Sequence, residues 1–414
     1  MGNIRRTTHA FFCLEDEYVV DVASIFQGVA PAPAKTGRVD AVAVLTGERH
    51  SLEHEEWEVL RSIPTDVWVD DQRFDRRVIS GLLEKALVVT DSGEGRFADA
   101  RARDQALTDL AWHPYAALYH FATRWSGVSI AGANEAEAEL AAQNAEAVSR
   151  LVAEHGLPPT ELAHVQSAQS VSLPGRERSE PFFRTLIERR TTRAFDTERP
   201  MSLDDLDTVV RYVFGCHGYA AGSGVVCIKR TSPSGGGLHP VTAYAVISNV
   251  AGVTPGLYHY NAGDHSLALL QELSLEEARA LATTATCDQR HFGEAHVSFF
   301  LVARFDRSHW KYRHHPRAYA AILMDAAHLS QTLYLVATEL GLGAFVTVVI
   351  NGRDIEDRLG LDGIENGVVA VCGCGPRSRR SSLLEPEFAA QPPTGPTAQG
   401  RRPQTSGASS PETM

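Results

Sequence analysis

The most regular pattern of apolar positions in the chain lies between about Arg317 and Leu340. Apolar residues recur there at spacings of three and four, the period of one face of an α-helix, and other apolar residues flank that face on nearly every side. The stripe consists of Ile322, Ala326, Leu329, Leu333, Val336 and Leu340. It predicts a long helix that is buried in a core or between subunits. Gly341-Leu-Gly343 follows, where a glycine is expected to end the helix.

Around this helix, the second half of the chain alternates between helical and strand-like periods. Helices are predicted at 182–190, 201–215, 275–284 and 354–359, with Ser202 as the cap of the second. Strands are predicted at 241–248, 297–304, 344–350 and 367–374, and a hairpin at 256–260 and 267–270. The apolar runs at 297–304 and 367–374 are long enough for central strands.

The N-terminal region carries weaker signals. Alternating segments at 18–25 and 38–45 predict paired strands, and Ser51 is expected to cap a helix that Pro64 ends. A helix at 76–85, a strand at 86–90, a turn at 91–93 and a further strand would complete the outline of a winged helix. A DNA-binding winged helix has an excess of arginine and lysine on its last helix, and acidic residues offset these here. A peptide-docking or purely structural winged helix is therefore favoured.

Two helices and a linker are predicted between these halves. The helices span 111–125 and 131–154, and a polar linker spans 166–179. From Pro386 onward the chain is rich in Pro, Gly, Ser, Thr and Gln and is expected to be disordered. The predicted organisation is a winged-helix-like domain at 1–110, a helical connector at 111–178, a main domain at 179–385 and a tail at 386–414.

Composition and charge narrow the class of protein. Hydrophobic residues make up 43% of the 414 residues, enough to bury cores, and the formal net charge of −12 argues against a nucleic-acid surface. The six cysteines follow no disulfide framework and no window approaches eighteen apolar residues, so a cytoplasmic protein without a membrane span is expected. Cys372 and Cys374 lie on a predicted strand without a second pair of ligands, which favours core packing over metal binding.

The stretch from Ser232 to Pro240, Ser-Pro-Ser-Gly-Gly-Gly-Leu-His-Pro, is a candidate binding loop. Three successive glycines permit positive φ and allow backbone N–H groups to approach a flat or anionic ligand. A phosphate-binding P-loop requires Gly-Lys-Ser/Thr at the start of a helix, and this stretch has no lysine. By itself the stretch fits a ligand-binding loop or a tight turn before a strand.

Arg189-Arg-Thr-Thr-Arg193 ends the predicted helix at 182–190. Three arginines and two hydroxyls can hold a phosphate group through charge-assisted hydrogen bonds. The same residues also fit a solvated basic helix end, where cations interact favourably with the helix dipole. The motif alone leaves both interpretations open.

Three motifs, taken in order, resemble the nitroreductase superfamily. Arg189-Arg-Thr-Thr-Arg193 resembles its Arg-Arg-Ser-x-Arg opening, and Pro233-Ser-Gly-Gly-Gly-Leu-His-Pro240 is similar to its Pro-Ser-Ala-Gly-Asn-Leu-Gln-Pro loop. Gly341-Leu-Gly343 matches its Gly-Leu-Gly signature. Further motifs resemble the SagB-type dehydrogenases of peptide maturation: Gly256-Leu-Tyr-His-Tyr260, Lys311-Tyr312, Arg317-Ala-Tyr319 and Asp325-Ala-Ala-His328. The resemblance covers about 115–376.

The resemblance implies an α+β nitroreductase-like fold with a mostly antiparallel central sheet, in an intertwined homodimer with FMN at the interface. It implies that the arginine-rich motif holds the phosphate and ribityl chain and that the glycine loop lies against the isoalloxazine ring. The implied cofactor-binding residues are Arg189, Arg190, Thr191, Arg193, Pro233, Ser234, Gly235, Gly236, Gly237, Leu238, Gly341, Leu342 and Gly343. Gly237 and His239 stand where the superfamily has Asn and Gln, so amide contacts from those side chains to the ring are expected to be absent.

The SagB resemblance also implies a reaction, the oxidation of azoline rings in a ribosomally made peptide to azoles. Lys311 and Tyr312 match the family's Lys-Tyr pair and are implied to be catalytic. A phenol has a pKa of about 10, and an adjacent ammonium favours its ionised form, so Tyr312 would be the base and Lys311 its activator, or the roles could be exchanged. Neighbours on a strand point to opposite faces, so the pair requires irregular backbone. Without the resemblance, the residues fit a surface lysine beside a packed tyrosine.

Three histidines near this pair are not expected to act. His314 and His315 precede a proline and do not present one face to a metal. His328 is expected to form a buried pair with Asp325, three residues earlier on the long helix.

Partners and alternative functions follow from the same resemblance. The N-terminal region is expected to dock a leader peptide by strand addition, and a cyclodehydratase is expected as a partner because the azoline must be made by another enzyme. Two alternatives stay open: an NAD(P)H-dependent reductase of nitro, quinone or enone compounds, and a flavin-containing redox-sensing regulator that binds DNA. The acidic charge balance disfavours the regulator.

Overall fold

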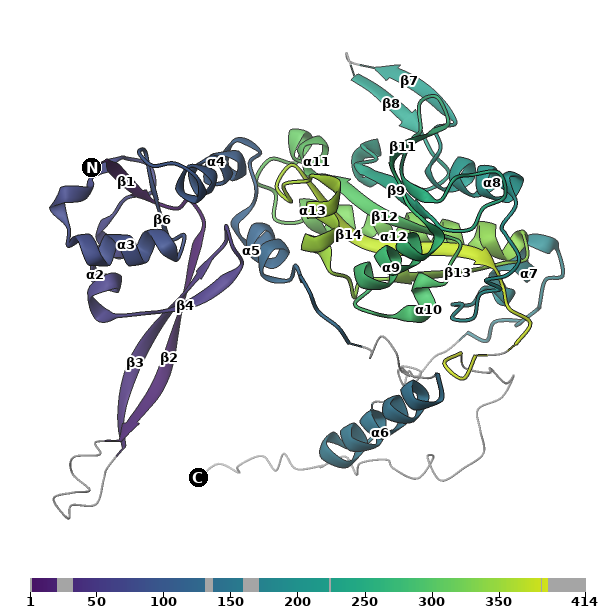
Figure 1. Cartoon of the computed structure of the whole chain (residues 1–414), viewed down its shortest axis with the longest axis horizontal. Helices are drawn as coiled ribbons and strands as arrows, with labels where there is room; N and C mark the ends of the chain where they lie inside the picture. The colour runs from purple at the N-terminus through teal and green to yellow at the C-terminus, as the bar shows by residue number, and fades with distance from the viewer. Residues whose placement is uncertain are drawn as a thin grey trace, which may run out of the picture.

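The computed structural model describes residues 2–20, 33–130, 137–158, 171–222, 225–380 and 382–385. Figure 1 shows a smaller N-terminal region and a larger C-terminal body, with α4 (Arg96–Asp109) and α5 (Pro114–Ala122) between them. One continuous cluster of buried hydrophobic side chains runs from Ile4 through Trp112 to the central sheet of the body. The N-terminal region is therefore packed against the body.

Two small antiparallel sheets form the N-terminal region, with strand orders β5-β1-β6 and β2-β3-β4. Their strands are β1 (Asn3–Arg6), β2 (Ala10–Val20), β3 (Pro33–Ala43), β4 (Glu48–Leu52), β5 (Val69–Asp70) and β6 (Val88–Thr90), and the helices beside them are α2 (His54–Ser62), η1 (Asp71–Arg73) and α3 (Arg76–Glu84). Strands β2 and β3 pair from Ala10 opposite Ala43 to Val20 opposite Pro33. The two strands pair, but the predicted partners are wrong: residues 38–43 pair with 10–15, and residues 18–20 pair with 33–35. The rest of the segment predicted at 18–25 lies outside the described residues.

Two predictions for this region are wrong. Ser51 lies in β4 and caps no helix; α2 begins at His54 and is capped by Glu53 in a capping box with Glu56. The strand expected after the turn at 91–93 is α4, whose N-cap is Gly95. The physical reason is that α4 has no side-chain cap and no single apolar stripe, so its sequence lacks the usual helix signals. The winged-helix outline as a whole stays a prediction.

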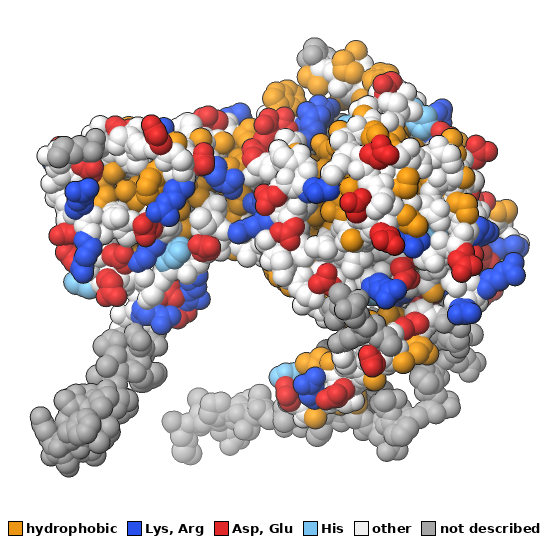
Figure 2. All heavy atoms as spheres, viewed as in Figure 1, with side chains coloured by type: hydrophobic (Ala, Val, Ile, Leu, Met, Phe, Trp, Pro, Cys, Tyr) orange, Lys and Arg blue, Asp and Glu red, His pale blue; other side chains and the backbone are white. Residues whose placement is uncertain are grey.

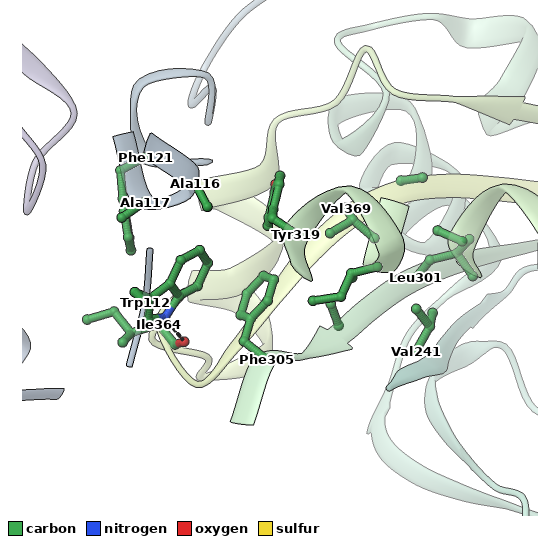
Figure 3. Packing of buried hydrophobic residues seen from close by; sticks show 14 of the residues in the cluster. Trp112, Ala116, Ala117, Phe121, Val241, Leu301, Phe305, Tyr319, Ile364 and Val369 are labelled. Carbon is green, nitrogen blue, oxygen red and sulfur yellow. Dashed lines mark hydrogen bonds between the residues drawn. The ribbon is translucent and has the colours of Figure 1, made fainter. Parts of the chain in front are cut away.

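A buried aromatic cluster fastens the two parts together. The indole N–H of Trp112 donates to the Ile364 carbonyl at 3.1 Å, and the Trp112 and Phe305 ring centroids are 4.7 Å apart. Figure 3 shows these side chains together with Tyr319. His120 on α5 extends the cluster, with Nδ1 3.0 Å from the Tyr319 hydroxyl. Residues just after α4 are therefore built into the core of the C-terminal body.

The C-terminal body is organised around a six-stranded antiparallel sheet in the order β11-β10-β9-β12-β14-β13. Its strands are β9 (Val241–Ile247), β10 (Gly256–Asn261), β11 (Ser266–Glu272), β12 (Val297–Arg304), β13 (Leu342–Thr347) and β14 (Asn366–Pro376). The two strands predicted to be central, β12 and β14, lie inside the sheet. Cys372 and Cys374 are fully buried on β14, and burial raises the pKa of the Cys374 thiol to about 12, which confirms their packing role.

Helix α12 (Ala318–Glu339) is the long helix that the apolar stripe predicts. Ile322, Ala326, Leu329 and Leu333 of the stripe are buried, and Gly341 follows the helix with a φ of +69°. Among the described residues, α12 alone is long and apolar enough to cross a membrane. It packs against β13, β14 and α8 (Leu203–Phe214), as a core helix does. These elements confirm the predicted α+β fold with a long buried helix.

The remaining helices cover the sheet or extend from it. They are α6 (Glu137–His155), α7 (Pro181–Glu188), α9 (Leu275–Ala285), α10 (Arg290–Gly293), α11 (Phe305–Lys311) and α13 (Gly352–Leu359). The Ser202 hydroxyl accepts the Asp205 N–H at 3.0 Å, which confirms the predicted cap of α8. The hairpin of β7 (Gly218–Gly222) and β8 (Val225–Lys229) projects from the top of the body in Figure 1 and was not predicted. Most of its described side chains are exposed on both faces, so its sequence does not alternate.

Candidate active site

One carboxylate on α12 holds the glycine-rich loop at 232–240. Asp325 accepts hydrogen bonds from the Ser234 hydroxyl at 2.5 Å and from the Gly235 N–H at 3.1 Å. The Ser234 oxygen in turn accepts the His239 N–H at 2.8 Å. Because this chain of hydrogen bonds joins both ends of the loop to a buried carboxylate, the loop backbone has one defined shape.

The two following glycines have the same backbone conformation and different surroundings. Gly236 and Gly237 have φ values of +65° and +69°, a region that glycine adopts without steric penalty. A Cβ on Gly236 would lie 2.5 Å from Tyr312 Oη and 2.9 Å from Lys311 Nζ. A Cβ on Gly237 would meet no atom within 4 Å. Gly236 therefore leaves room for the ends of two side chains, and Gly237 faces open space.

Those two side chains are the predicted catalytic pair. Lys311 is the last residue of α11 and Tyr312 is its C-cap, where the chain leaves the helical path. The Lys311 Nζ atom lies 5.5 Å from the centre of the Tyr312 ring, within range of a cation–π interaction. The structure thus brings Lys311 and Tyr312 to Gly236, and the end of a helix supplies the irregular backbone that the pair requires.

The arginine-rich segment 189–193 lies near the opposite end of α12. The Arg189 guanidinium stacks over the Tyr334 ring at 5.1 Å, and the Thr191 and Tyr334 hydroxyls are 3.0 Å apart. The Tyr334 hydroxyl also accepts the Val346 N–H at 3.1 Å. A helical rise of about 1.5 Å per residue separates Tyr334 from Asp325 by about 14 Å along α12.

The Gly341-Leu342-Gly343 segment packs directly on this arginine-rich segment. Thr191 forms an isolated bridge with Ala344, and the Thr192 N–H donates to the Ala344 carbonyl at 2.8 Å. A Cβ on Gly343 would lie 2.5 Å from the Thr192 side chain, so this close approach requires glycine. The first and third motifs therefore form one end of the site, and the glycine loop with Lys311 and Tyr312 forms the other.

The donors at the arginine-rich end of the site suit a phosphate group. In the part of the chain that the structure describes, no carboxylate lies within ion-pair distance of Arg189, Arg190 or Arg193. Glu385 pairs with Arg377 at 2.9 Å, and its other oxygen accepts the backbone N–H of Arg193 at 2.5 Å. Unpaired guanidinium groups beside the Thr191 hydroxyl can bind a phosphate monoester, and the open face of the glycine loop can take a flat ring. An elongated cofactor such as FMN fits this arrangement.

Asp325 shows where the sequence interpretation failed. Its spacing from His328 on one helix face predicted a buried pair, and that prediction is wrong. Both carboxylate oxygens bind the loop, and the buried His328 Nδ1 has no hydrogen-bond partner among the described residues. Asp325 binds the loop because the loop offers a hydroxyl and an N–H within hydrogen-bond distance of its carboxylate. Helix periodicity does not reveal such a contact.

Two further residues of the site gave no sequence signal. Tyr334 joins the arginine-rich segment to β13, although nothing in its surroundings on the helix distinguishes it. Arg230, 8% exposed, donates from Nη1 to the Val241 carbonyl at 2.9 Å, and its Nε has no partner among the described residues. Its side chain lines a cavity of about 10 Å³ behind the loop together with His239, enough for one water molecule. Burial lowers the pKa of His239, and the charge of Arg230 acts in the same direction.

Comparison with known proteins agrees with this geometry. Residues 186–375 match the model of the nitroreductase family. This part of the chain is a nitroreductase domain. The matched range contains the arginine-rich segment from Arg189, the glycine loop, Lys311-Tyr312 and Gly341-Leu-Gly343, so the family resemblance inferred from these motifs is confirmed.

Two relatives match parts of this chain. The trifolitoxin-processing protein TfxB of Rhizobium leguminosarum bv. trifolii is 32% identical over 162 residues, which are 38% of this chain and 39% of that protein. A protein of Methanocaldococcus jannaschii that is named as a nitroreductase is 28% identical over 174 residues, 42% of this chain and 81% of that protein. The chain thus spans about two fifths of the length of TfxB.

Two solved structures are similar to part of this chain. The E. coli microcin synthetase McbBCD complex with truncated pro-MccB17 bound has a TM-score of 0.47 and 17% sequence identity, over 66% of this chain and 97% of the matched chain. A nitroreductase-type structure from Ralstonia eutropha has a TM-score of 0.39 and 22% identity, over 54% of this chain and all of the matched chain.

Proposed function

We propose that this protein is an FMN-dependent oxidoreductase that acts in the maturation of a ribosomally made peptide and oxidises azoline rings to azoles. The observation that carries the proposal is the approach of Lys311 Nζ and Tyr312 Oη to Gly236, in the loop that resembles the flavin-ring loop. Dehydrogenation beside a flavin requires a proton acceptor held at that position. The similarity of part of the chain to a protein that processes trifolitoxin supports a peptide substrate.

The proposed reaction removes two hydrogens from the azoline ring, one as a proton and one as a hydride. Bound FMN would supply the hydride acceptor through its isoalloxazine ring. Tyr312 would accept the proton at Oη and Lys311 would orient it, or the two roles would be exchanged; Lys311 Nζ lies 5.5 Å from the centre of the Tyr312 ring. The defined shape of the loop would hold the azoline at a fixed distance from Tyr312 Oη.

The same proposal assigns the cofactor-binding residues. Arg189, Arg190, Thr191 and Arg193 would hold the phosphate and ribityl chain at one end of α12. The backbone of 233–238 would lie along the ring at the other end, with the open side of Gly237 towards it. Because Gly237 has no side-chain amide, the contacts to the ring at that position would come from the backbone.

The N-terminal region would dock the leader part of the peptide by strand addition. Strands β2 and β4 are the outer strands of their sheet, so each has one edge without a strand partner among the described residues. An enzyme that builds the azoline from a Cys, Ser or Thr residue, a cyclodehydratase, must act before this one. The reaction would take place in the cytoplasm, where such peptides are made.

A homodimer is proposed from the surface of α7, α8 and α12. A groove of about 420 Å³ there is lined mostly by apolar side chains: Pro181, Phe182, Thr185, Thr208, Tyr212, Leu335, Val336, Glu339 and Leu340. Phe182 and Ile187 on α7 are 62% and 76% exposed. Contiguous exposed apolar surface of this kind is typical of protein interfaces. Light scattering on the purified protein tests the proposal, and a monomer at micromolar concentration would contradict it.

Lys311→Ala and Tyr312→Phe test the proposed function. Both variants should retain flavin, seen in the visible absorption of the purified protein, and lose turnover of a synthetic peptide that contains a thiazoline. Full activity in both variants would show that the reaction needs neither Lys311 nor Tyr312. A wild-type protein that binds no FMN when titrated with it would contradict the proposal as a whole.

The second candidate is an NAD(P)H-dependent reductase of nitro, quinone or enone compounds. The similarity to the M. jannaschii protein, over 81% of that protein, favours it. It predicts rapid reduction of the bound flavin by NADPH in a stopped-flow experiment. The peptide oxidase predicts slow reduction by NADPH and reduction by the thiazoline peptide.

A further inference from the structure

The turn that follows the candidate pair is bound by the end of α4. The Arg313 guanidinium donates to the Asp109 carbonyl at 3.3 Å, and the His314 N–H donates to the Ala111 carbonyl at 2.9 Å. Ala111 and His314 both have left-handed backbone, with φ values of +53° and +52°. Such conformations are rare outside glycine and are retained where the surroundings impose them. Two strained residues thus meet in one hydrogen bond between the N-terminal region and the nitroreductase domain.

The helix that ends at the candidate pair is contacted by the same stretch. The Trp112 ring lies 4.8 Å from the His309 ring and 4.7 Å from the Phe305 ring, measured between centroids. Residues 109–112 are named here the α4 end, and three of them, Asp109, Ala111 and Trp112, therefore contact the segment 305–314.

Lys311 and Tyr312 lie between these contacts. His309 precedes Lys311 by two residues, and Arg313 follows Tyr312 directly. The ends of both side chains lie within 3 Å of the position that a Cβ on Gly236 would take, so a small shift of the segment changes how the pair meets the loop.

We propose that the α4 end positions Lys311 and Tyr312 against Gly236, so that the N-terminal region is part of the active site as well as the proposed docking site for the peptide. The inference rests on the roles proposed for Lys311 and Tyr312. A peptide whose binding shifts α4 would also shift Lys311 and Tyr312, through the contacts of residues 109–112. The α4 end acts as a positioning element, because it touches neither loop nor substrate.

Variants at the contacts between the α4 end and the segment 305–314 test whether these contacts position Lys311 and Tyr312 or only join the two parts of the protein. Arg313→Ala removes an exposed contact and leaves the core intact, and His309→Leu replaces the ring that packs edge-on against Trp112 by an aliphatic side chain of similar size. Arg103→Ala is the matched control, since Arg103 on α4 also donates to a carbonyl of the nitroreductase domain, that of Asp362 at 3.1 Å. The contacts of Arg103 lie with Asp362, Leu45 and Phe121, away from the pair.

Two measurements on the full-length protein decide the question. Hydrogen exchange of 309–317, followed by mass spectrometry, should be about tenfold faster in the His309→Leu/Arg313→Ala double variant and unchanged in Arg103→Ala. The kcat for a synthetic thiazoline peptide should fall about tenfold in the double variant with little change in KM, because positioning acts on the reacting groups. Arg313→Lys, which retains a donor, should recover most of the loss caused by Arg313→Ala.

Each outcome supports or overturns the inference. Exchange and kcat at wild-type values in the double variant would overturn it, as would equal losses in Arg103→Ala. If the wild-type protein binds no flavin or ignores the thiazoline peptide, the proposed function fails, and hydrogen exchange alone then decides the inference. Faster exchange in the double variant and not in Arg103→Ala would support the inference, and unchanged exchange in the double variant would overturn it.

Discussion

The two ends of α12 are built in opposite ways. At the Asp325 end, a buried carboxylate is satisfied by the Ser234 hydroxyl and the Gly235 N–H, so the protein itself completes the hydrogen bonds of the loop. At the Tyr334 end, the cations of 189–193 have no carboxylate partner among the described residues. The Asp325 end is preorganised, and the Tyr334 end leaves positive charge available for a ligand. Substitutions at the Asp325 end should therefore change catalysis and stability, and those at the Tyr334 end should change ligand binding.

The largest expected effect is at Gly236. Gly236→Ala would place a methyl group where Tyr312 Oη and Lys311 Nζ lie, and these flexible ends would move away at little cost in stability. A displacement of about 1 Å at reacting groups lowers rates about 100-fold, so turnover of a thiazoline peptide should fall by that order. Steady-state kinetics and thermal unfolding measure the two effects separately.

Gly237→Ala is the matched control for this prediction. It carries the same backbone penalty of about 1 kcal/mol for a left-handed alanine, and its methyl group points into the open space proposed for the flavin ring, where no atom of Lys311 or Tyr312 lies within 4 Å. Both variants should therefore unfold at similar temperatures, but Gly237→Ala should raise the Kd for FMN, whereas Gly236→Ala should lower the kcat of the flavin-saturated enzyme. Equal kcat in the two flavin-saturated variants would show that the approach of the pair to Gly236 has no role in the reaction.

At the other end of α12, Arg189→Ala should weaken flavin binding. Loss of one charge-assisted hydrogen bond to a phosphate costs about 2 kcal/mol, so the Kd for FMN should rise about 30-fold. Fluorescence titration of the apoprotein measures this Kd, and its salt dependence should become less steep. Arg184→Ala, on an exposed site one turn earlier on α7, should leave the Kd nearly unchanged. The same loss in both variants would mean that only the general positive charge of this helix matters.

The comparison between the two ends also shows what the sequence could and could not predict. The stripe from Ile322 to Leu333 predicted α12 because burial of one face imposes the helical period. It could not show that Asp325 binds the loop rather than His328, because that contact joins residues about ninety positions apart. Periodicity likewise predicted the strands of the sheet and missed α4, which has no single apolar stripe.

The residues of the site were predictable to a similar extent. Motif order and resemblance predicted that Arg189–Arg193, the loop and Lys311-Tyr312 act together. The sequence could not distinguish Gly236 from Gly237, because the difference lies in what approaches each of them in space. The contacts of the α4 end were also hidden, since two of them are made to backbone carbonyls, which every residue possesses.

A smaller effect is expected from the carboxylate that holds the loop. Asp325→Asn offers one carbonyl oxygen in place of two, so either Ser234 or Gly235 loses its acceptor, and the free energy of unfolding should fall by about 1.5 kcal/mol. Urea unfolding measures this change. Glu339→Gln is the control, because Glu339 accepts the Thr185 hydroxyl at 2.6 Å on the exposed last turn of the same helix. A larger loss in Glu339→Gln would contradict the view that the Asp325 end is the preorganised one.

The smallest effect, taken per pH unit, is a pH dependence of stability at the N-terminal end of α12, where His120 contacts Tyr319. Burial lowers the pKa of His120 to about 3, far below its value of 6.5 in the unfolded chain. The unfolded state therefore binds more protons than the folded state below pH 6.5, and stability is complete above that pH and decreases as the pH falls. One such histidine contributes a slope of about 1.4 kcal/mol per pH unit.

His120→Gln removes this titration and keeps a side chain that can form hydrogen bonds to Tyr319 and to the Gly363 carbonyl. Urea unfolding between pH 6.5 and 4.5 should then show a slope that is shallower by about 1.4 kcal/mol per pH unit. Replacement of the exposed His155 on α6 by Gln should leave the slope as in the wild type. An unchanged slope in His120→Gln would mean that the acid sensitivity arises elsewhere. A shallower slope would place it in the aromatic cluster that joins the N-terminal region to α12, away from the arginines, which do not titrate in this range.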